Sequence, residues 1–170
     1  MAWTTDRLSI TALAQADAAE LFDALDHPEV GRYIGGPDVQ TLPLLEERIS
    51  RLLRGPADTS QRWLNFVVRQ HEGSSVVGRL EATTHGDWAE VAWVLSPRYW
   101  GLGYGTEGAA WLIDHLDEEC EISEFWATAD PLNTASISLM RRLGFAEQVE
   151  PWARAVDSYD DGDVVMARWK

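Results

Sequence analysis

Three glycines stand at alternate positions, 101, 103 and 105, between a stretch that predicts a strand and one that predicts a helix. Glycine lets the backbone bend so that successive N–H groups point to one place. The helix that follows adds unpaired N–H groups and the positive end of its dipole. Such a turn favours an anion, and a phosphate or pyrophosphate is the natural ligand. A glycine-rich connection without a ligand is the alternative.

Two other nucleotide sites share part of this pattern. Gly103, Gly105 and Gly108 have the spacing of the dinucleotide-binding fingerprint, and acidic residues follow further along. In that site the first glycine directly follows its strand, whereas here residues 96–102 intervene, and the chain after Gly108 is too short for the remaining strands. A P-loop needs a Lys followed by Ser or Thr after its glycines, which this stretch lacks. We therefore discount both sites.

The order of predicted elements indicates an α/β fold around a mixed sheet. A strand is predicted at 3–12, helices at 17–25 and from about 41 to 55, strands at 63–70, 75–84 and 88–95, a helix at 106–116, a strand at 124–129, a helix at 133–143, and strands at 145–149 and 164–169. Gly35-Gly36-Pro37 predicts a loop. The sheet is expected to be antiparallel first and parallel where the helix at 106–116 joins 88–95 to 124–129.

The length and charge of the chain limit the number of domains and the kind of partner it can bind. The chain has 170 residues, which fits one domain over 1–170. It carries 28 acidic against 14 basic residues, a formal charge of −14. This charge argues against a surface that follows nucleic-acid phosphates and suits a cationic partner, or it serves solubility. Monomer and homodimer both remain open.

The lone Cys120 cannot form an internal disulfide, and no Cys/His cluster with zinc spacing accompanies it. We therefore expect a reducing compartment and no metal. The first ten residues lack a basic start followed by an apolar core, and no run approaches the roughly 20 apolar residues of a membrane span. The expected location is the cytoplasm, without a membrane partner.

Two ordered motifs about 30 residues apart carry a resemblance to a known family. They are Tyr99-Trp-Gly-Leu-Gly-Tyr-Gly-Thr-Glu107 and Asn133-Thr-Ala-Ser-Ile-Ser-Leu-Met-Arg-Arg-Leu-Gly-Phe145, with weaker echoes at 27–33 and 161–167. Over nearly the whole chain the sequence resembles the GCN5-related N-acetyltransferases (GNAT), in particular the RimJ and RimL branch that acetylates ribosomal-protein N-termini. Trp100 departs from the Gln or Arg of the general family motif, as is common within this branch. The resemblance implies the single-domain GNAT fold.

The resemblance also implies an acetyl-CoA site. Its pyrophosphate would bind backbone N–H groups between Gly101 and Thr106, and its pantetheine arm would pair with the strand edge at Val94 and Leu95. Asn133 would hydrogen-bond that arm, with capping of its own helix as the alternative. Arg98 is close enough to meet a phosphate, or is a solvated arginine. The expected cofactor residues are Val94, Leu95, Arg98, Trp100, Gly101, Leu102, Gly103, Tyr104, Gly105, Thr106, Asn133 and Ser136.

Amide formation by direct attack needs a neutral amine, a polarised thioester carbonyl and a route for the proton of the amine. A backbone N–H near Val94 or Leu95 is expected to polarise the carbonyl. For the proton route the candidates are Glu81 and Glu90 on central strands and His85 in the turn between them, with ordinary strand polarity as the alternative for each.

On the helix at 133–143, Asn133, Ser136 and Met140 share a face that could look at the cofactor. By resemblance Ser136 would stabilise or protonate the departing thiolate, with a packing contact as the alternative. Many family members place a tyrosine acid at the position of Met140, and methionine cannot donate a proton. Glu107 is expected to support the helix dipole rather than catalysis.

The expected function is an acetyl-CoA-dependent N-acetyltransferase that acts on a primary amine, either a protein N-terminus or a small molecule. The alternatives are an inactive CoA-binding sensor and an acyltransferase with a longer acyl donor. Most strand tryptophans should be core, although Trp93 or Trp152 could line an acceptor pocket. The tryptophans in or beside predicted strands are Trp63, Trp88, Trp93, Trp100, Trp126 and Trp152.

Overall fold

The computed structural model describes residues 2–34, 36 and 38–170, so Gly35 and Pro37 of the expected loop lie outside the described residues. The strands are β1 (Ala2–Thr4), β2 (Leu8–Ala12), β3 (Arg62–Gln70), β4 (Val76–His85), β5 (Trp88–Leu95), β6 (Glu124–Ala129), β7 (Ala146–Glu147) and β8 (Val164–Trp169). The helices are α1 (Ala18–Leu25), α2 (Leu42–Arg54), α3 (Tyr104–Cys120) and α4 (Thr134–Arg142), with short 3₁₀ helices η1 (Gln15–Asp17), η2 (Val30–Tyr33) and η3 (Pro97–Tyr99).

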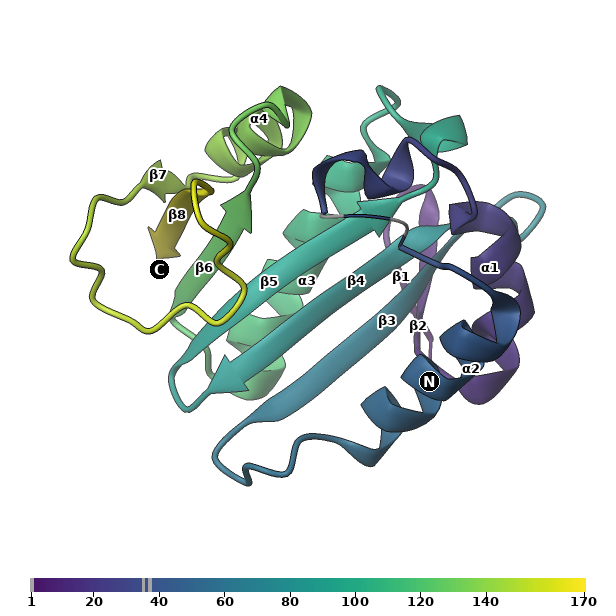
Figure 1. Ribbon diagram of the computed structural model, residues 1–170, viewed down its shortest axis with the longest axis horizontal. Coiled ribbons are helices and arrows are strands. Elements are labelled where there is room, and N and C mark those ends of the chain that lie inside the picture. Colours follow the sequence, from purple (N-terminus) through teal and green to yellow (C-terminus); the bar gives the residue numbers. More distant parts are fainter. Residues whose placement is uncertain (1, 35, 37) are drawn as a thin grey trace.

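The described strands form one mixed sheet in the order β1-β2-β3-β4-β5-β6-β8-β7 (Figure 1). Its pairs are antiparallel except β5 with β6, which α3 joins as a parallel crossover. This confirms the predicted α/β class and the position of the parallel pair.

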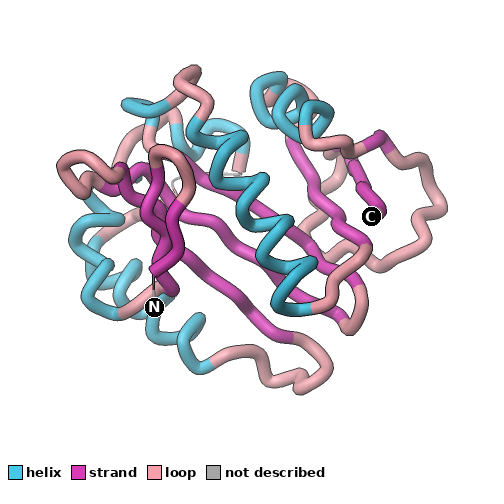
Figure 2. The backbone as a smooth tube through the Cα atoms, turned by 180° about the vertical axis from the view of Figure 1, so that it is seen from behind, coloured by secondary structure: helices cyan, strands magenta, loops and turns pink. Residues whose placement is uncertain are grey.

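Helices cover both faces of this sheet. Helix α3 crosses one face, as the view from behind shows (Figure 2), and its Leu112 and Leu116 pack on the main core with Phe66 of β3. On the opposite face, α1 and α2 form a second core around Leu21 and Ile49. A third, smaller core lies beneath the irregular segment between β7 and β8; its members are Trp88, Trp126, Val165, Ala167, Trp152, Val156 and Tyr159.

Local signals explain where the helices begin. The Thr41 hydroxyl accepts a hydrogen bond from the Leu44 N–H and caps α2, and the Asn133 side chain accepts one from the Ser136 N–H and caps α4. Helix α3 begins at Tyr104, directly after Gly103, whose left-handed backbone (φ 84°) turns the chain into the helix.

One expectation about the N-terminal half was wrong. The single strand expected at 3–12 is a hairpin of β1 and β2, broken at residues 5–7. Most tryptophans in or beside strands do belong to the cores: Trp88 and Trp126 are buried, and Trp93 and Trp152 pack against buried clusters. Trp100 is 45% exposed, and its indole N–H donates to the Leu95 carbonyl. No helix in the described part of the chain is long and apolar enough to cross a membrane.

The parallel pair of strands is short. Strands β5 and β6 pair only from Trp88 to Glu90 and from Glu124 to Trp126, although both strands continue beyond these residues. The carboxyl end of β5 therefore has no neighbour on its β6 side. An edge of this kind leaves backbone N–H and C=O groups available to a ligand.

Candidate active site

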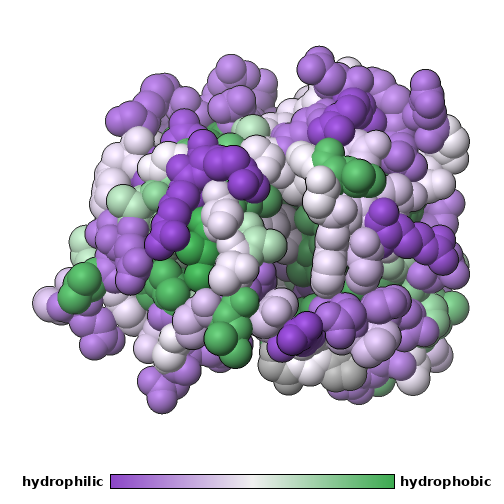
Figure 3. Space-filling model, turned by 90° about the horizontal axis from the view of Figure 1, so that it is seen from above, coloured by the Kyte–Doolittle hydropathy of each residue, from purple (hydrophilic) through white to green (hydrophobic). Residues whose placement is uncertain are grey.

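A cavity of about 600 Å³ lies where β5 and β6 separate. Its walls come from η2, the end of β5, the turn that follows, the first turn of α3, and α4. Figure 3 looks down on this end of the sheet and shows hydrophobic residues reaching a surface that is otherwise mostly hydrophilic. The volume is in the range of small-molecule and cofactor sites.

The cavity brings together the two motifs that lie about 30 residues apart in sequence. Nine of the predicted cofactor residues line it: Val94, Leu95, Trp100, Gly101, Gly103, Gly105, Thr106, Asn133 and Ser136. The exposed Arg98 and the neighbouring Leu102 and Tyr104 are not among its lining residues. Glu81 and Glu90 are not either.

The glycines of the turn serve two different purposes. Gly101 and Gly103 have positive φ angles of 72° and 84°, which side-chain-bearing residues rarely adopt. Gly105 is helical instead, and a Cβ atom there would lie 3.0 Å from Leu139 Cδ1 of α4. Gly101 and Gly103 therefore shape the turn, whereas Gly105 permits the close approach of α3 and α4 that forms the cavity wall.

The beginning of α3 supplies hydrogen-bond donors to this cavity. The first helical bond runs from the Glu107 N–H to the Gly103 carbonyl. The N–H groups of Tyr104, Gly105 and Thr106 therefore have no acceptor within the helix. Together with the helix dipole they make this end of the cavity favourable to an anion.

The three residues predicted to share one face of α4 do not all reach the cavity. Asn133 and Ser136 line the cavity, but Met140 is fully buried in the main core and does not. Arg142, one turn beyond Ser138, lines the cavity and places its Nη2 3.4 Å from the Thr106 hydroxyl. A guanidinium thus faces the anion-favouring turn, and sequence reasoning had placed this role at Arg98.

Sequence reasoning also missed the wall formed by η2. Glu29, Val30, Tyr33 and Ile34 line the cavity from the N-terminal half of the chain. The only signal for them was the weak family echo at 27–33, because nothing in the local pattern links this short helix to the glycine turn.

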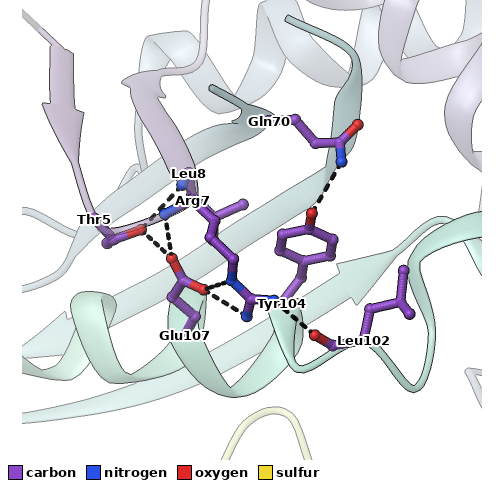
Figure 4. Close-up of polar contacts among 7 residues, drawn as sticks. All are labelled: Thr5, Arg7, Leu8, Gln70, Leu102, Tyr104 and Glu107. Carbon is purple, nitrogen blue, oxygen red and sulfur yellow. Dashed lines mark hydrogen bonds and ion pairs between the residues drawn. The ribbon is translucent and has the colours of Figure 1, made fainter. Parts of the chain in front are cut away.

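Glu107 proved to have a specific partner. Its carboxylate accepts hydrogen bonds from the backbone N–H and the Nε of Arg7 and from the Thr5 hydroxyl (Figure 4). Burial raises the pKa of Glu107, but the Thr5 and Arg7 contacts outweigh burial and hold the pKa below its ordinary value. The side chain therefore ties α3 to the turn between β1 and β2, in addition to any effect on the dipole.

Glu81 lies in a network of opposite charges. Its Oε1 is 3.0 Å from Arg79 Nε and 3.1 Å from Arg48 Nη2, and both arginines also contact Asp38. Burial by itself raises the pKa of Glu81, but the two guanidinium groups outweigh burial and lower it. A carboxylate stabilised in this way is a weak base.

Glu90 is in a different environment on β5. Its side chain is 7% exposed, with Oε1 3.1 Å from His85 Nε2 and Oε2 accepting the backbone N–H of Ser158. The His85 ring stacks on Trp88 at 4.1 Å between centroids. The Asp157 carboxylate joins them, and ligand atoms of His85, Glu90 and Asp157 lie within 4.8 Å of one another. Among the described residues this is the group best suited to hold a cation.

Comparison with known proteins identifies acetyltransferases as relatives. The model of the acetyltransferase (GNAT) domain matches residues 7–146. An uncharacterised N-acetyltransferase p20 of Bacillus licheniformis is 27% identical over 85% of this chain and 82% of its own length. An uncharacterised protein YkkB of Bacillus subtilis is 24% identical over 92% of both chains.

Solved structures share the fold. RimL, a ribosomal L7/L12 α-N-protein acetyltransferase in complex with coenzyme A, has a TM-score of 0.79 at 16% identity over 97% of this chain and 95% of its own. A ribosomal-protein-S5-alanine acetyltransferase from Vibrio fischeri has a TM-score of 0.76 at 16% identity over 99% and 96%. At the level of the fold these neighbours agree with the resemblance to the RimJ and RimL branch. With a family match over most of its length and this fold, the chain belongs to the GNAT acetyltransferase family.

Proposed function

We propose that this protein is an acetyl-CoA-dependent N-acetyltransferase that transfers the acetyl group to a primary amine by direct attack. The amine is a protein N-terminus or a small amine. One observation carries the proposal: two motifs distant in sequence line a single cavity, with an anion-favouring turn at one end and an unpaired strand edge beside it. A long donor with a phosphate end and an amide-bearing arm suits both features.

The donor residues follow from this arrangement. The N–H groups at the start of α3 would hold the pyrophosphate, with Arg142 as the nearby cation. The arm would lie along the open edge of β5 at Val94 and Leu95, as an added strand does. The Asn133 Oδ1 accepts the Ser136 N–H and caps α4, so the side-chain amide N–H group remains available to the pantetheine arm.

The amine would attack the thioester in the cavity, and its proton would leave along β5 toward Glu90, which lies outside the cavity lining. The amine nitrogen attacks the thioester carbonyl carbon, the C–N bond forms and the C–S bond breaks, and the amine loses a proton while the thiolate leaves. Glu90 is the better base of the two predicted carboxylates, because Glu81 is already neutralised by Arg79 and Arg48. The ring of His85 offers Glu90 a path for the proton toward solvent. Ser136, which lines the cavity, would donate to the thiolate.

An inactive CoA-binding sensor is the second candidate, and the burial of Met140 favours it. The position that carries a tyrosine acid in many relatives is an apolar core residue here. Tyr33 and Tyr99 also line the cavity, so the described walls still offer phenolic hydroxyl groups to an active enzyme.

Thiol release from acetyl-CoA, measured against peptides with free N-termini, polyamines and aminoglycosides, tests the proposal. Turnover with any amine is expected, and the charge of −14 favours the cationic acceptors. CoA binding without turnover across the panel would support the sensor instead. A folded protein that binds neither CoA nor acetyl-CoA would overturn both.

A further inference from the structure

The turn between β1 and β2 lies against the start of α3, which comes about a hundred residues later in the sequence (Figure 4). Arg7 makes three kinds of contact there. Its Nε and Nη2 bind the Glu107 carboxylate at 2.7 and 2.6 Å, its Nη1 donates to the Leu102 carbonyl at 2.9 Å, and its guanidinium lies 4.4 Å above the Tyr104 ring. None of these groups lines the cavity.

Arg7 is itself held firmly. Its backbone N–H donates to Glu107, and its carbonyl accepts the N–H of His71, which follows β3. The Tyr104 hydroxyl accepts a hydrogen bond from Gln70 at the end of β3. His71 therefore anchors the backbone of Arg7, and Gln70 anchors the ring that lies beneath the guanidinium.

The contact with Leu102 has a consequence inside the turn. The carbonyl of Leu102 and the N–H of Gly103 belong to one peptide unit, which is planar and trans, so the two point in opposite directions. Arg7 holds the carbonyl on the outer side. The Gly103 N–H is thereby directed to the other side of the peptide, and Gly103 lines the cavity.

We propose that Arg7 is a positioning residue for donor binding: by holding the Leu102 carbonyl and the Glu107 carboxylate, it fixes the peptide N–H groups of the turn that binds the donor phosphates. This inference rests on the proposed function. Arg7 acts through geometry and not through its charge, because Glu107 neutralises the guanidinium at contact distance. Without this clamp the left-handed residues of the turn are free to rotate the peptide, and the donors lose their common direction.

The test compares CoA affinity by calorimetry in wild type, Arg7→Met and Arg7→Lys. Arg7→Met should weaken CoA binding about tenfold, because donor groups that are not preoriented lose part of their hydrogen bonding. Arg7→Lys should weaken it nearly as much, because a single ammonium cannot hold both the carboxylate and the carbonyl in the fork geometry of arginine. CoA affinity retained in Arg7→Lys but not in Arg7→Met would show a charge effect and overturn the proposal.

Arg69→Met is the matched control, because Arg69 also makes two close ion pairs, with Asp17 and Glu20, away from the cavity. It should lose stability but keep its affinity for CoA. Binding of S-acetylpantetheine, which has no pyrophosphate, should be equal in wild type and Arg7→Met. Equal weakening of both ligands would reduce Arg7 to a general structural residue.

The outcomes separate this inference from the function on which it rests. If wild type does not bind CoA, the proposed function fails. If wild type binds CoA and folded Arg7→Met binds it equally well, only the inference fails. Should Arg7→Met not fold, Glu107→Gln replaces it, and that variant should weaken CoA binding about threefold by loosening the same clamp; unchanged affinity there would also refute the proposal.

Discussion

The two ends of strand β5 differ in what they are made of. At the carboxyl end the site consists mainly of backbone: two left-handed glycines, the unpaired N–H groups of α3 and an open strand edge. At the amino end it consists of side chains, where Glu90 meets His85 of β4 and the N–H of Ser158 from the segment before β8. A backbone site is encoded locally, whereas a side-chain site depends on segments that only the fold brings together.

The largest effect on CoA binding is expected when a side chain is added to the glycine turn at the carboxyl end of β5. Gly103→Val places a branched residue in a left-handed conformation, a strain of about 1–3 kcal/mol, and its Cβ would lie 3.2 Å from Arg7 Nη2. CoA binding should be lost in calorimetry. Gly86→Val is the control, since Gly86 has a similar φ of 75° with open space around it. Full CoA affinity in Gly103→Val would refute the location assigned to the phosphates.

Near the amino end of β5, Glu90→Gln should lower kcat about 100-fold through loss of the general base and leave the KM for acetyl-CoA unchanged. Steady-state kinetics with the amine found in the panel measure both constants. Glu124→Gln is the matched control, because Glu124 is also a buried carboxylate on this face but pairs with Arg154. A kcat of Glu90→Gln within threefold of wild type would move the base elsewhere.

Side chains near the carboxyl end of β5 are also expected to contribute to CoA binding, but less than the backbone does. Arg142→Gln should raise the dissociation constant of CoA about fivefold, because one charge-assisted contact to phosphate is lost. Arg141→Gln tests the same change at the adjacent residue, which is 63% exposed and pairs with Glu147. Equal effects of the two substitutions would mean that Arg142 acts only as a surface charge.

The smallest effect concerns the link between Arg7 and Glu107 and its dependence on pH. Because the pKa of Glu107 is lowered in the folded state, its stabilisation is present above the ordinary value of 4.5 and is lost as pH falls through the folded-state pKa. Wild type should melt about 3 °C above Glu107→Gln near neutral pH. This difference should shrink as pH falls below about 4.5. A difference that does not depend on pH would mean that the charge of Glu107 does not stabilise the fold.

The predicted parts of the fold were those with local causes. Alternation and helical spacing located most strands and helices to within a few residues, and Asn133 and Thr41 were placed at the starts of their helices. The break at residues 5–7 was missed: the hairpin turn is closed by hydrogen bonds between Thr5 and Leu8, and Glu107 of α3 adds contacts that the local sequence does not show.

The same division applies to the candidate site. By itself the sequence determined the family, the anion-favouring turn and the two motifs that line the cavity, because glycine, helix starts and strand edges act over a few residues. Only the tertiary structure decided which charged groups matter. Arg142 and not Arg98 faces the turn, Glu81 is neutralised while Glu90 meets His85, and Arg7 holds the Leu102 carbonyl of the glycine turn. Charges act across space, so their roles depend on neighbours that the order of residues does not name.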